Sequence, residues 1–348
     1  MSQRDSQVLK LTDGRILGFA EYGSPTGKPV FFFHGFPSSR LEASVILDAC
    51  HREDLRIIAP ERPGFGLSTF NPHHRIIDWP EDVRALAAHL GISRFAILGG
   101  SGGAPYALAC ARALPAEMMS AVGLMAPAGP WKEAGAEGVP LFSRITALLA
   151  YYWPASLRAT SAGIVGLTRW LLALRPITRR IDRWLEKTSL EKTKKDIEAS
   201  DTTASTTSSP AATSPLASTS KSNPPSSATA TTTTSTKERR EALLRLVFES
   251  FRQGTAPMVR ESQLLTWQGW GFPLEEVSYD KILVWHGAED RQSPIRMVRY
   301  LAQRLPHCEL REFEGETHFS LVKHLGAILE ELVPRGEEGK RVKAEVET

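Results

Sequence analysis

The stretch Phe95-Ala96-Ile97-Leu98-Gly99-Gly100-Ser101-Gly102-Gly103 decides the fold of this chain. Its four apolar residues are typical of a buried strand, and the Ala- and Leu-rich segment from Gly103 to Leu114 predicts a helix after the Gly-x-Ser-x-Gly element. A serine in such a turn has strained backbone angles, and flanking glycines permit the close approach that the turn needs. The order predicts a serine hydroxyl that faces solvent at the carboxyl edge of a sheet. The motif alone leaves a phosphate-binding turn or a plain tight corner open.

Strand and helix candidates alternate on both sides of this motif. The expected strands are Ile16–Tyr22, Pro29–Phe33, Leu55–Ala59, Ala121–Met125, Ile282–Trp285 and Glu309–Phe313. The expected helices are Leu41–Cys50, Ile77–Leu90, Pro294–Leu305 and Phe319–Leu332. Apolar strands that alternate with helices indicate an α/β fold with a mainly parallel, doubly wound sheet covered on both faces.

Residues 127–279 break this alternation, and we expect them to form a helical lid inserted between core parts 1–126 and 280–333. Helical spacing recurs at Leu141–Trp153 and Gly163–Leu174. Six of the eight tryptophans fall in this insertion: Trp131, Trp153, Trp170, Trp184, Trp267 and Trp270. A single tryptophan more often packs than binds a ligand, but the set predicts an apolar cavity beneath the lid.

Two segments are expected to be disordered. Residues 200–236 are almost wholly Ser, Thr, Ala and Pro, a composition that buries too little apolar area to offset chain entropy. The charged tail 334–348 is expected to be flexible as well.

Composition and charge narrow the functional classes. The net charge of +3 over 348 residues is small, and no Lys/Arg block is interleaved with aromatic residues, so we expect no nucleic-acid partner. The first residues lack an apolar secretory stretch, and the three cysteines, Cys50, Cys110 and Cys308, favour free thiols over disulfides. Both features predict a cytoplasmic location.

The most apolar region, Val139–Trp170, is interrupted by arginines and a proline, so we expect no integral membrane segment. The expected partner is a small-molecule substrate. Oligomeric state is left open.

A serine hydroxyl becomes a good nucleophile only when a base takes its proton, and that imidazole needs a carboxylate to fix its tautomer. Where the serine occupies such a strand-to-helix turn (the elbow), the three residues follow one another along the chain in the order serine, acid, histidine. Asp290, with Glu289 as its rival, follows the strand Ile282–Trp285, and His318 follows the strand Glu309–Phe313. All lie at the edge of the sheet expected for Ser101.

A developing oxyanion needs two backbone N–H donors. We assign them to Gly102, directly after the serine, and to Phe36, in the loop His34-Gly35-Phe36-Pro37 that follows a strand. Pro37 has no N–H. His34 is interpreted as a residue that organises this loop rather than one that transfers protons.

Several segments along the chain together resemble the α/β-hydrolase superfamily. They are His34–Pro37, Arg62–Ser68 (RPGFGLS), Gly99–Gly103, and the Asp290 and His318 segments in that order. The resemblance covers about Gly14–Met125 and Ile282–Leu332 but not the lid, and it is more specific for the fold than for the substrate. The chain is distantly similar to lidded esterases and to members of the proline iminopeptidase type.

The resemblance implies an ester-cleaving serine hydrolase that works through an acyl-enzyme and needs no metal or organic cofactor. The family's H-G-x-x-D spacing favours Asp290 over Glu289. Epoxide hydrolases and haloalkane dehalogenases share the HGFP-like loop but use aspartate at the elbow, so Ser101 disfavours both. Proline iminopeptidases typically have tryptophan after the serine, where this chain has Gly102.

Other functions remain open. The same three side chains could cleave an amide or a carbon–carbon bond or transfer an acyl group. A hydrolase scaffold can also serve as a non-catalytic binding protein.

Overall fold

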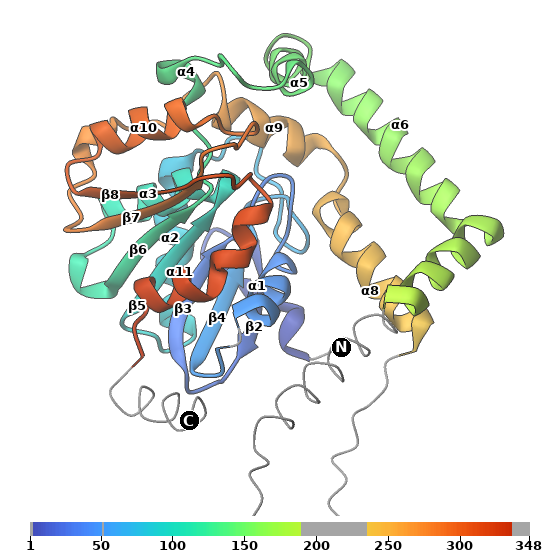
Figure 1. Ribbon diagram of the computed structural model, residues 1–348, viewed down its shortest axis with the longest axis horizontal. Coiled ribbons are helices and arrows are strands. Elements are labelled where there is room, and N and C mark those ends of the chain that lie inside the picture. Colours follow the sequence, from blue (N-terminus) through green and yellow to red (C-terminus); the bar gives the residue numbers. More distant parts are fainter. Residues whose placement is uncertain (1–2, 51, 189–234, 336–348) are drawn as a thin grey trace, which may run out of the picture. The chain divides into compact units, whose positions relative to one another are not determined.

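The computed structural model describes residues 3–50, 52–188 and 235–335 (Figure 1). The chain divides into two compact units, of which the first comprises Met1–Val165 with Leu246–Thr348 and the second Gly166–Arg245.

An eight-stranded sheet forms the centre of the first unit, in the order β1-β2-β4-β3-β5-β6-β7-β8. The strands are β1 (Gln7–Lys10), β2 (Ile16–Gly23), β3 (Lys28–Phe33), β4 (Leu55–Pro60), β5 (Phe95–Gly100), β6 (Met119–Met125), β7 (Ile282–Gly287) and β8 (Cys308–Phe313). Strand β2 is antiparallel to β1 and β4, and all other pairs are parallel. The predicted mainly parallel α/β sheet is confirmed. Strand β1 was not expected, because four residues at a sheet edge carry almost no apolar pattern.

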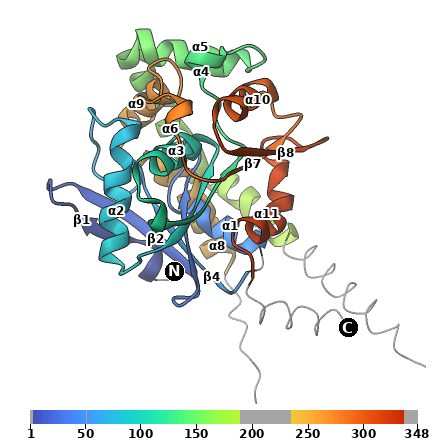
Figure 2. The same ribbon diagram turned by 90° about the vertical axis from the view of Figure 1, so that its left-hand side faces the viewer.

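Helices cover both faces of this sheet. They are α1 (Glu42–Cys50), α2 (Trp79–His89), α3 (Ala104–Ala113), α10 (Ile295–Arg304) and α11 (Leu325–Leu332). Figure 2 shows α2 on one side of the sheet and α11 on the other. The last helix is shorter than expected, because a 3-10 turn, Ser320–His324, precedes α11.

Alternate residues of β3 pack in the two layers of the core, one on each face of the sheet. Phe31 and Phe33 pack in the cluster that holds residues of α2, α3 and α10. Val30 and Phe32 belong to the cluster that holds residues of α1 and α11. This period of two along a strand explains why a continuous apolar run indicated a sheet buried on both faces.

Residues 127–279 contain helices and, among their described residues, no strand. In the first unit lie α4 (Trp131–Ala134), α5 (Leu141–Tyr152), the start of α6 (Pro154–Ala173) and α9 (Ala256–Leu265). Helix α6 begins nine residues before the expected Gly163, because Pro154 suits the first helical position. Within the second unit, Arg240 of α8 (Thr236–Phe248) pairs with Asp182.

The two segments expected to be disordered lie almost entirely outside the described residues. Of residues 200–236, only Ser235 and Thr236 are described, and α8 begins at Thr236, so the expected segment extends too far by that residue. Of the tail, only Pro334 and Arg335 are described. Within the described ranges, no helix combines the length and the apolar character needed to cross a membrane.

Gly103 sets how closely α3 approaches β3. A Cβ at this position would lie 2.1 Å from the carbonyl oxygen of Phe33, a backbone atom that cannot move aside. We therefore expect Gly103→Ala to lower the free energy of unfolding by about 1–3 kcal/mol, the usual cost of overpacking. Urea unfolding followed by circular dichroism measures this loss.

Gly163→Ala is the matched control, because nothing lies within 4 Å of a Cβ added at this position of α6. Alanine there is expected to raise stability by about 0.5–1 kcal/mol. Equal unfolding midpoints for Gly103→Ala and the wild-type protein would contradict the close packing of α3.

Candidate active site

Ser101 lies at the sharp turn between β5 and α3, as the sequence predicted for a strand–turn–helix element. Its φ of 48° is in the left-handed region, which a residue with a side chain rarely adopts. A hydrogen bond of 3.0 Å from the Ala128 N–H to the Ser101 carbonyl oxygen helps to hold this conformation. Such strain persists mainly at functional positions, which makes the Ser101 hydroxyl a candidate functional group.

His318 joins Ser101 to Asp290 by two hydrogen bonds. Its Nδ1 lies 2.7 Å from Asp290 Oδ2, and its Nε2 lies 3.0 Å from Ser101 Oγ. The carboxylate can only accept, so Nδ1 carries the proton and Nε2 is left to accept from the serine hydroxyl. Three residues that are far apart in the sequence thus meet beyond the carboxyl ends of β5, β7 and β8.

Asp290 is held firmly in this position. The side chain is buried, and its Oδ1 accepts the backbone N–H groups of Gln292 at 2.7 Å and Ser293 at 3.0 Å. The rival Glu289 is exposed, and its backbone N–H donates to the carbonyl oxygen of Glu316 instead. Of the two candidate acids, only Asp290 contacts the imidazole.

A second histidine, His286, lies beside the same carboxylate. It is buried, its Nε2 donates to the Ser293 carbonyl oxygen at 2.9 Å, and it lies 3.6 Å from Asp290 Oδ2. Burial lowers the pKa of His286, so this ring stays neutral at pH values at which an ordinary histidine begins to take up a proton.

The other two predicted site residues lie together next to Ser101. A Cβ added to Gly102 would lie 2.7 Å from the Cβ of Phe36, 3.4 Å from the Phe36 nitrogen and 3.2 Å from Cδ1 of Leu265 in α9. The Phe36 backbone nitrogen therefore lies close to Gly102, the residue that directly follows Ser101. The same distances explain why a large side chain cannot follow the serine here unless Phe36 moves.

A buried arginine, which sequence reasoning missed, fixes the loop that carries Phe36. Arg62 donates to the carbonyl oxygens of His34 and Gly35, and its Nε donates to Glu261 of α9 at 2.7 Å. Both charged side chains are fully buried. Burial opposes the ionisation of Glu261, but the positive charge of Arg62 together with the contributions of His74 and Tyr106 outweighs it and lowers the pKa of Glu261 to about 2.

His34 also organises the loop, in agreement with its interpretation from the sequence. Its Nδ1 donates to the Gly35 carbonyl oxygen at 2.9 Å, and its Nε2 accepts the Arg62 backbone N–H at 3.3 Å. Burial, and then the charge of Arg62, hold the pKa of His34 well below its usual value, so the ring stays neutral.

Glu42 places a further carboxylate beside Ser101, and no pattern in the sequence pointed to it. Its Oε2 accepts the Gly35 N–H at 2.9 Å. A Cβ added to Gly35 would lie within 3.6 Å of both Glu42 carboxylate oxygens and of the Ser101 Cβ. Burial raises the pKa of this carboxyl. The hydrogen bond fixes the Gly35 peptide from the side opposite to Arg62.

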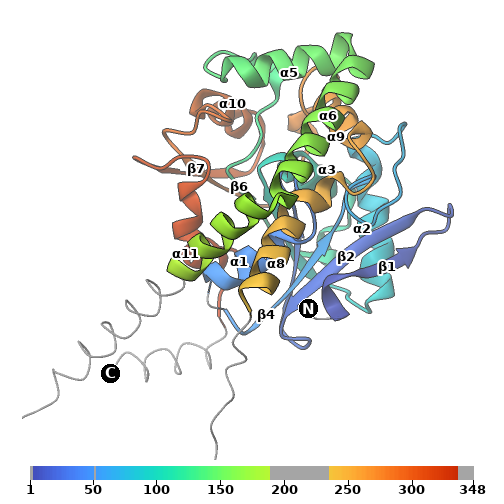
Figure 3. The same ribbon diagram turned by 90° about the vertical axis from the view of Figure 1, so that its right-hand side faces the viewer.

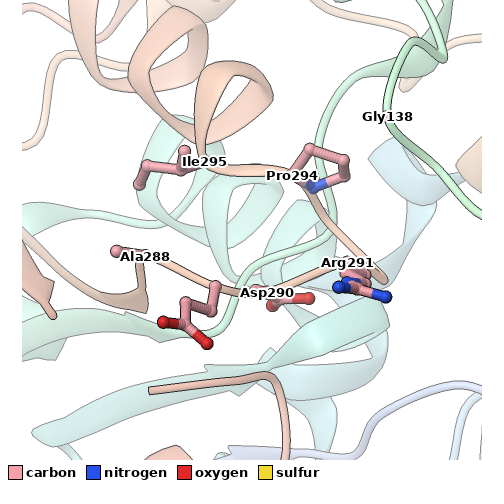
Figure 4. A pocket seen from close by; sticks show the side chains of 7 residues that line it. Gly138, Ala288, Asp290, Arg291, Pro294 and Ile295 are labelled. Atoms are coloured by element: carbon pink, nitrogen blue, oxygen red, sulfur yellow. The ribbon is translucent and has the colours of Figure 1, made fainter. Parts of the chain in front are cut away.

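A cavity of about 350 Å³ lies behind the Asp290 loop (Figure 4). Its lining residues are Gly138, Ala288, Glu289, Asp290, Arg291, Pro294 and Ile295. Neither Ser101 nor His318 lines it, so it does not hold the atoms that would react with the serine. Among the residues that the structure describes, no group of three or more His, Cys, Asp or Glu side chains is arranged to hold a metal ion.

Comparison with known proteins places this architecture in context. Residues 28–153 match the family model for the alpha/beta hydrolase fold. A proline iminopeptidase from Xanthomonas citri is 36% identical over 112 residues, which make up 30% of this chain and 34% of that protein. The match thus spans about a third of the length of this curated relative.

Two solved structures share the fold over almost the whole chain. An esterase from Rhodococcus sp. ECU1013 has a TM-score of 0.57 at 16% identity and covers 95% of this chain and 100% of its own. A bromoperoxidase from Bacillus anthracis has a TM-score of 0.56 at 13% identity, with the same coverage. Sheet topology, family model and structural likeness agree that the chain has the α/β-hydrolase fold.

Proposed function

We propose that this protein is a serine hydrolase that cleaves carboxylic esters of apolar small molecules. Ser101 is the nucleophile, His318 the general base and acid, and Asp290 the residue that orients the imidazole. The observation that carries the proposal is the continuous line of hydrogen bonds from Ser101 Oγ through His318 to Asp290, 3.0 and 2.7 Å long. Nucleophile and base are within the reach that proton transfer needs.

The proposed reaction has two steps. Ser101 Oγ attacks the ester carbonyl carbon while its proton passes to His318 Nε2, and the negative oxygen is bound by the N–H groups of Phe36 and Gly102. The carbon–oxygen bond to the alcohol then breaks, and the alcohol takes the proton from the imidazolium. In the second step, water attacks the acyl-serine with His318 as base, which releases the acid and restores the serine hydroxyl.

Apolar side chains around the reacting atoms support an apolar substrate. Leu265 and Phe36 adjoin Gly102, as the distances to an added Cβ show. Phe319 follows the catalytic histidine, with its ring 5.2 Å from that of His318, and is 75% exposed. An acyl or alcohol chain that covers these groups would gain hydrophobic binding energy.

A second candidate function is the cleavage of aminoacyl amides. The similarity to proline iminopeptidases over 112 residues favours it, and the Glu42 carboxylate beside Ser101 could pair with a substrate ammonium group. Gly102, where those peptidases typically have tryptophan, counts against it. The Glu42 side chain therefore separates the two candidates experimentally.

The neighbouring carboxylates Asp290 and Glu289 give a matched test of the triad. We expect Asp290→Asn to lower kcat for p-nitrophenyl butyrate by about 10⁴-fold, because the amide no longer holds the reactive tautomer of His318. Glu289→Gln, one residue away and exposed, should leave kcat within about twofold, as expected for a surface site. Equal effects of the two substitutions would refute the assigned acid.

Substrate preference distinguishes the two candidate activities. We expect kcat/KM to rise roughly tenfold from p-nitrophenyl acetate to the butyrate, since each buried methylene contributes about 0.8 kcal/mol. Prolyl and alanyl p-nitroanilides should react more slowly than either ester. Initial rates measured over the series decide between the activities.

Glu42→Gln supplies the control for this comparison, because its amide oxygen can still accept the Gly35 N–H. On the ester proposal it changes KM for esters and aminoacyl amides alike. A rise in KM confined to substrates with a free amine, together with faster amide turnover by the wild-type protein, would replace the ester proposal with the amide one.

A further inference from the structure

Helix α5 buries its small residues and exposes its large apolar ones. Ala147 and Ala150 are buried, whereas Leu141, Ile145, Leu148 and Tyr152, spaced three or four residues apart, form one exposed stripe. Phe142 adds to it at 80% exposure, Leu141 is 69% exposed and Tyr152 63%. Figure 3 shows α5 at the outer edge of the first unit. A surface helix normally has the opposite arrangement, with its large apolar side chains turned to the core.

The inward face of α5 is satisfied, so the helix cannot simply be turned over. Ala147 packs in a cluster with Trp131, Val139 and Met297. Ala150 packs with Leu157 and Val259, and its carbonyl oxygen accepts a hydrogen bond of 2.8 Å from the Gln263 side chain of α9. These contacts commit the small face to the protein and leave the large apolar face outward. A contiguous exposed apolar surface of this kind marks an interaction site.

Charge along the sequence indicates what covers this face. Residues 141–165, the part of the first unit that holds α5 and the start of α6, contain two arginines and no aspartate, glutamate or lysine, although the whole chain is nearly balanced, with 42 basic and 39 acidic residues. Arg144 borders the apolar stripe of α5, and Arg158 follows in α6; both are exposed. A second copy of this chain would bring these arginines against like charges, which disfavours self-association. An anionic surface would be attracted.

The aromatic residues at the end of α5 favour a lipid surface over an acidic protein. Tyr151, Tyr152 and Trp153 follow one another and are all exposed, Trp153 at 60%. Tyrosine and tryptophan prefer the boundary between lipid headgroups and acyl chains, because one end of each ring system is apolar and the other polar. Exposed apolar residues flanked by arginine and aromatic residues are typical of helices that lie in the plane of a membrane.

We propose that the exposed face of α5, comprising Leu141, Phe142, Ile145, Leu148, Tyr152 and Trp153, docks on the surface of an anionic phospholipid membrane. The apolar side chains enter the headgroup boundary, and Arg144 and Arg158 contact lipid phosphates. Helix α9, on which α5 packs, carries Leu265 next to Gly102. Docking would therefore bring the lipid close to the helix that borders the candidate active site. The proposal does not require that site to be an esterase.

Co-sedimentation of the full chain with vesicles tests this surface. The protein should pellet with vesicles of phosphatidylcholine and phosphatidylserine, pellet much less with phosphatidylcholine alone, and be released by high salt. The variant Phe142→Ser/Ile145→Ser/Tyr152→Ser should lose this binding. Val8→Ser/Val322→Ser, which removes exposed apolar side chains at two other places, is the matched control and should bind like the wild-type protein.

A second variant tests charge without changing the apolar face. Arg144→Glu/Arg158→Glu should weaken binding to phosphatidylserine vesicles more than about tenfold, since each basic residue at an anionic surface contributes roughly fivefold to affinity. If circular dichroism shows that the serine variant is misfolded, the arginine variant alone tests the proposal. Absence of wild-type binding, equal binding to neutral vesicles, or unchanged binding by the arginine variant would overturn the proposal. A wild-type dimer in sedimentation velocity that the serine variant converts to monomer would overturn it in favour of self-association.

Discussion

The candidate site depends on the hydrogen bonds and the ion pair that the buried guanidinium of Arg62 makes. It donates to two successive carbonyl oxygens of the loop that carries Phe36 and pairs with Glu261 of α9. A buried charge is tolerated when it is paired and hydrogen-bonded, and here each of the three guanidinium nitrogens has a partner in the loop or in α9. Glu261 also accepts a hydrogen bond from the Tyr106 hydroxyl of α3 at 2.7 Å, so the helix after Ser101 belongs to the same network. One ion pair thus joins the parts that must keep a fixed geometry.

The backbone conformation around Ser101 restricts the geometry of the candidate site as well. Ser101 has a positive φ at the end of β5, and the glycine at 103 lets α3 start almost in contact with the Phe33 carbonyl oxygen. The serine is therefore held by strand, turn and helix together, while the loops after β7 and β8 bring Asp290 and His318 to it. A side chain held by such rigid elements needs little reorganisation when charge develops beside it.

The sequence made the alternating strands, the elbow and the residues that meet there predictable, because each follows the end of an apolar strand and carries a side chain of distinct chemistry. The pair of Arg62 and Glu261 was not predictable, since 199 positions separate the partners and a single glutamate in α9 has no distinguishing pattern. Glu42 was not predictable either, because a single glutamate at the start of α1 has no distinguishing pattern. The outward apolar face of α5 was hidden as well, because helical spacing shows that a face exists but not which way it points.

Labelling with a fluorophosphonate tests the central claim most directly, because the probe reacts with an activated serine whatever the natural substrate. Peptide mapping of the labelled wild-type protein should find the phosphonate on Ser101, and a folded His318→Ala variant should remain unlabelled, since no imidazole lies 3.0 Å from the hydroxyl to take its proton. An unlabelled Ser101 in the folded wild-type protein, or equal labelling of the variant, would contradict the account.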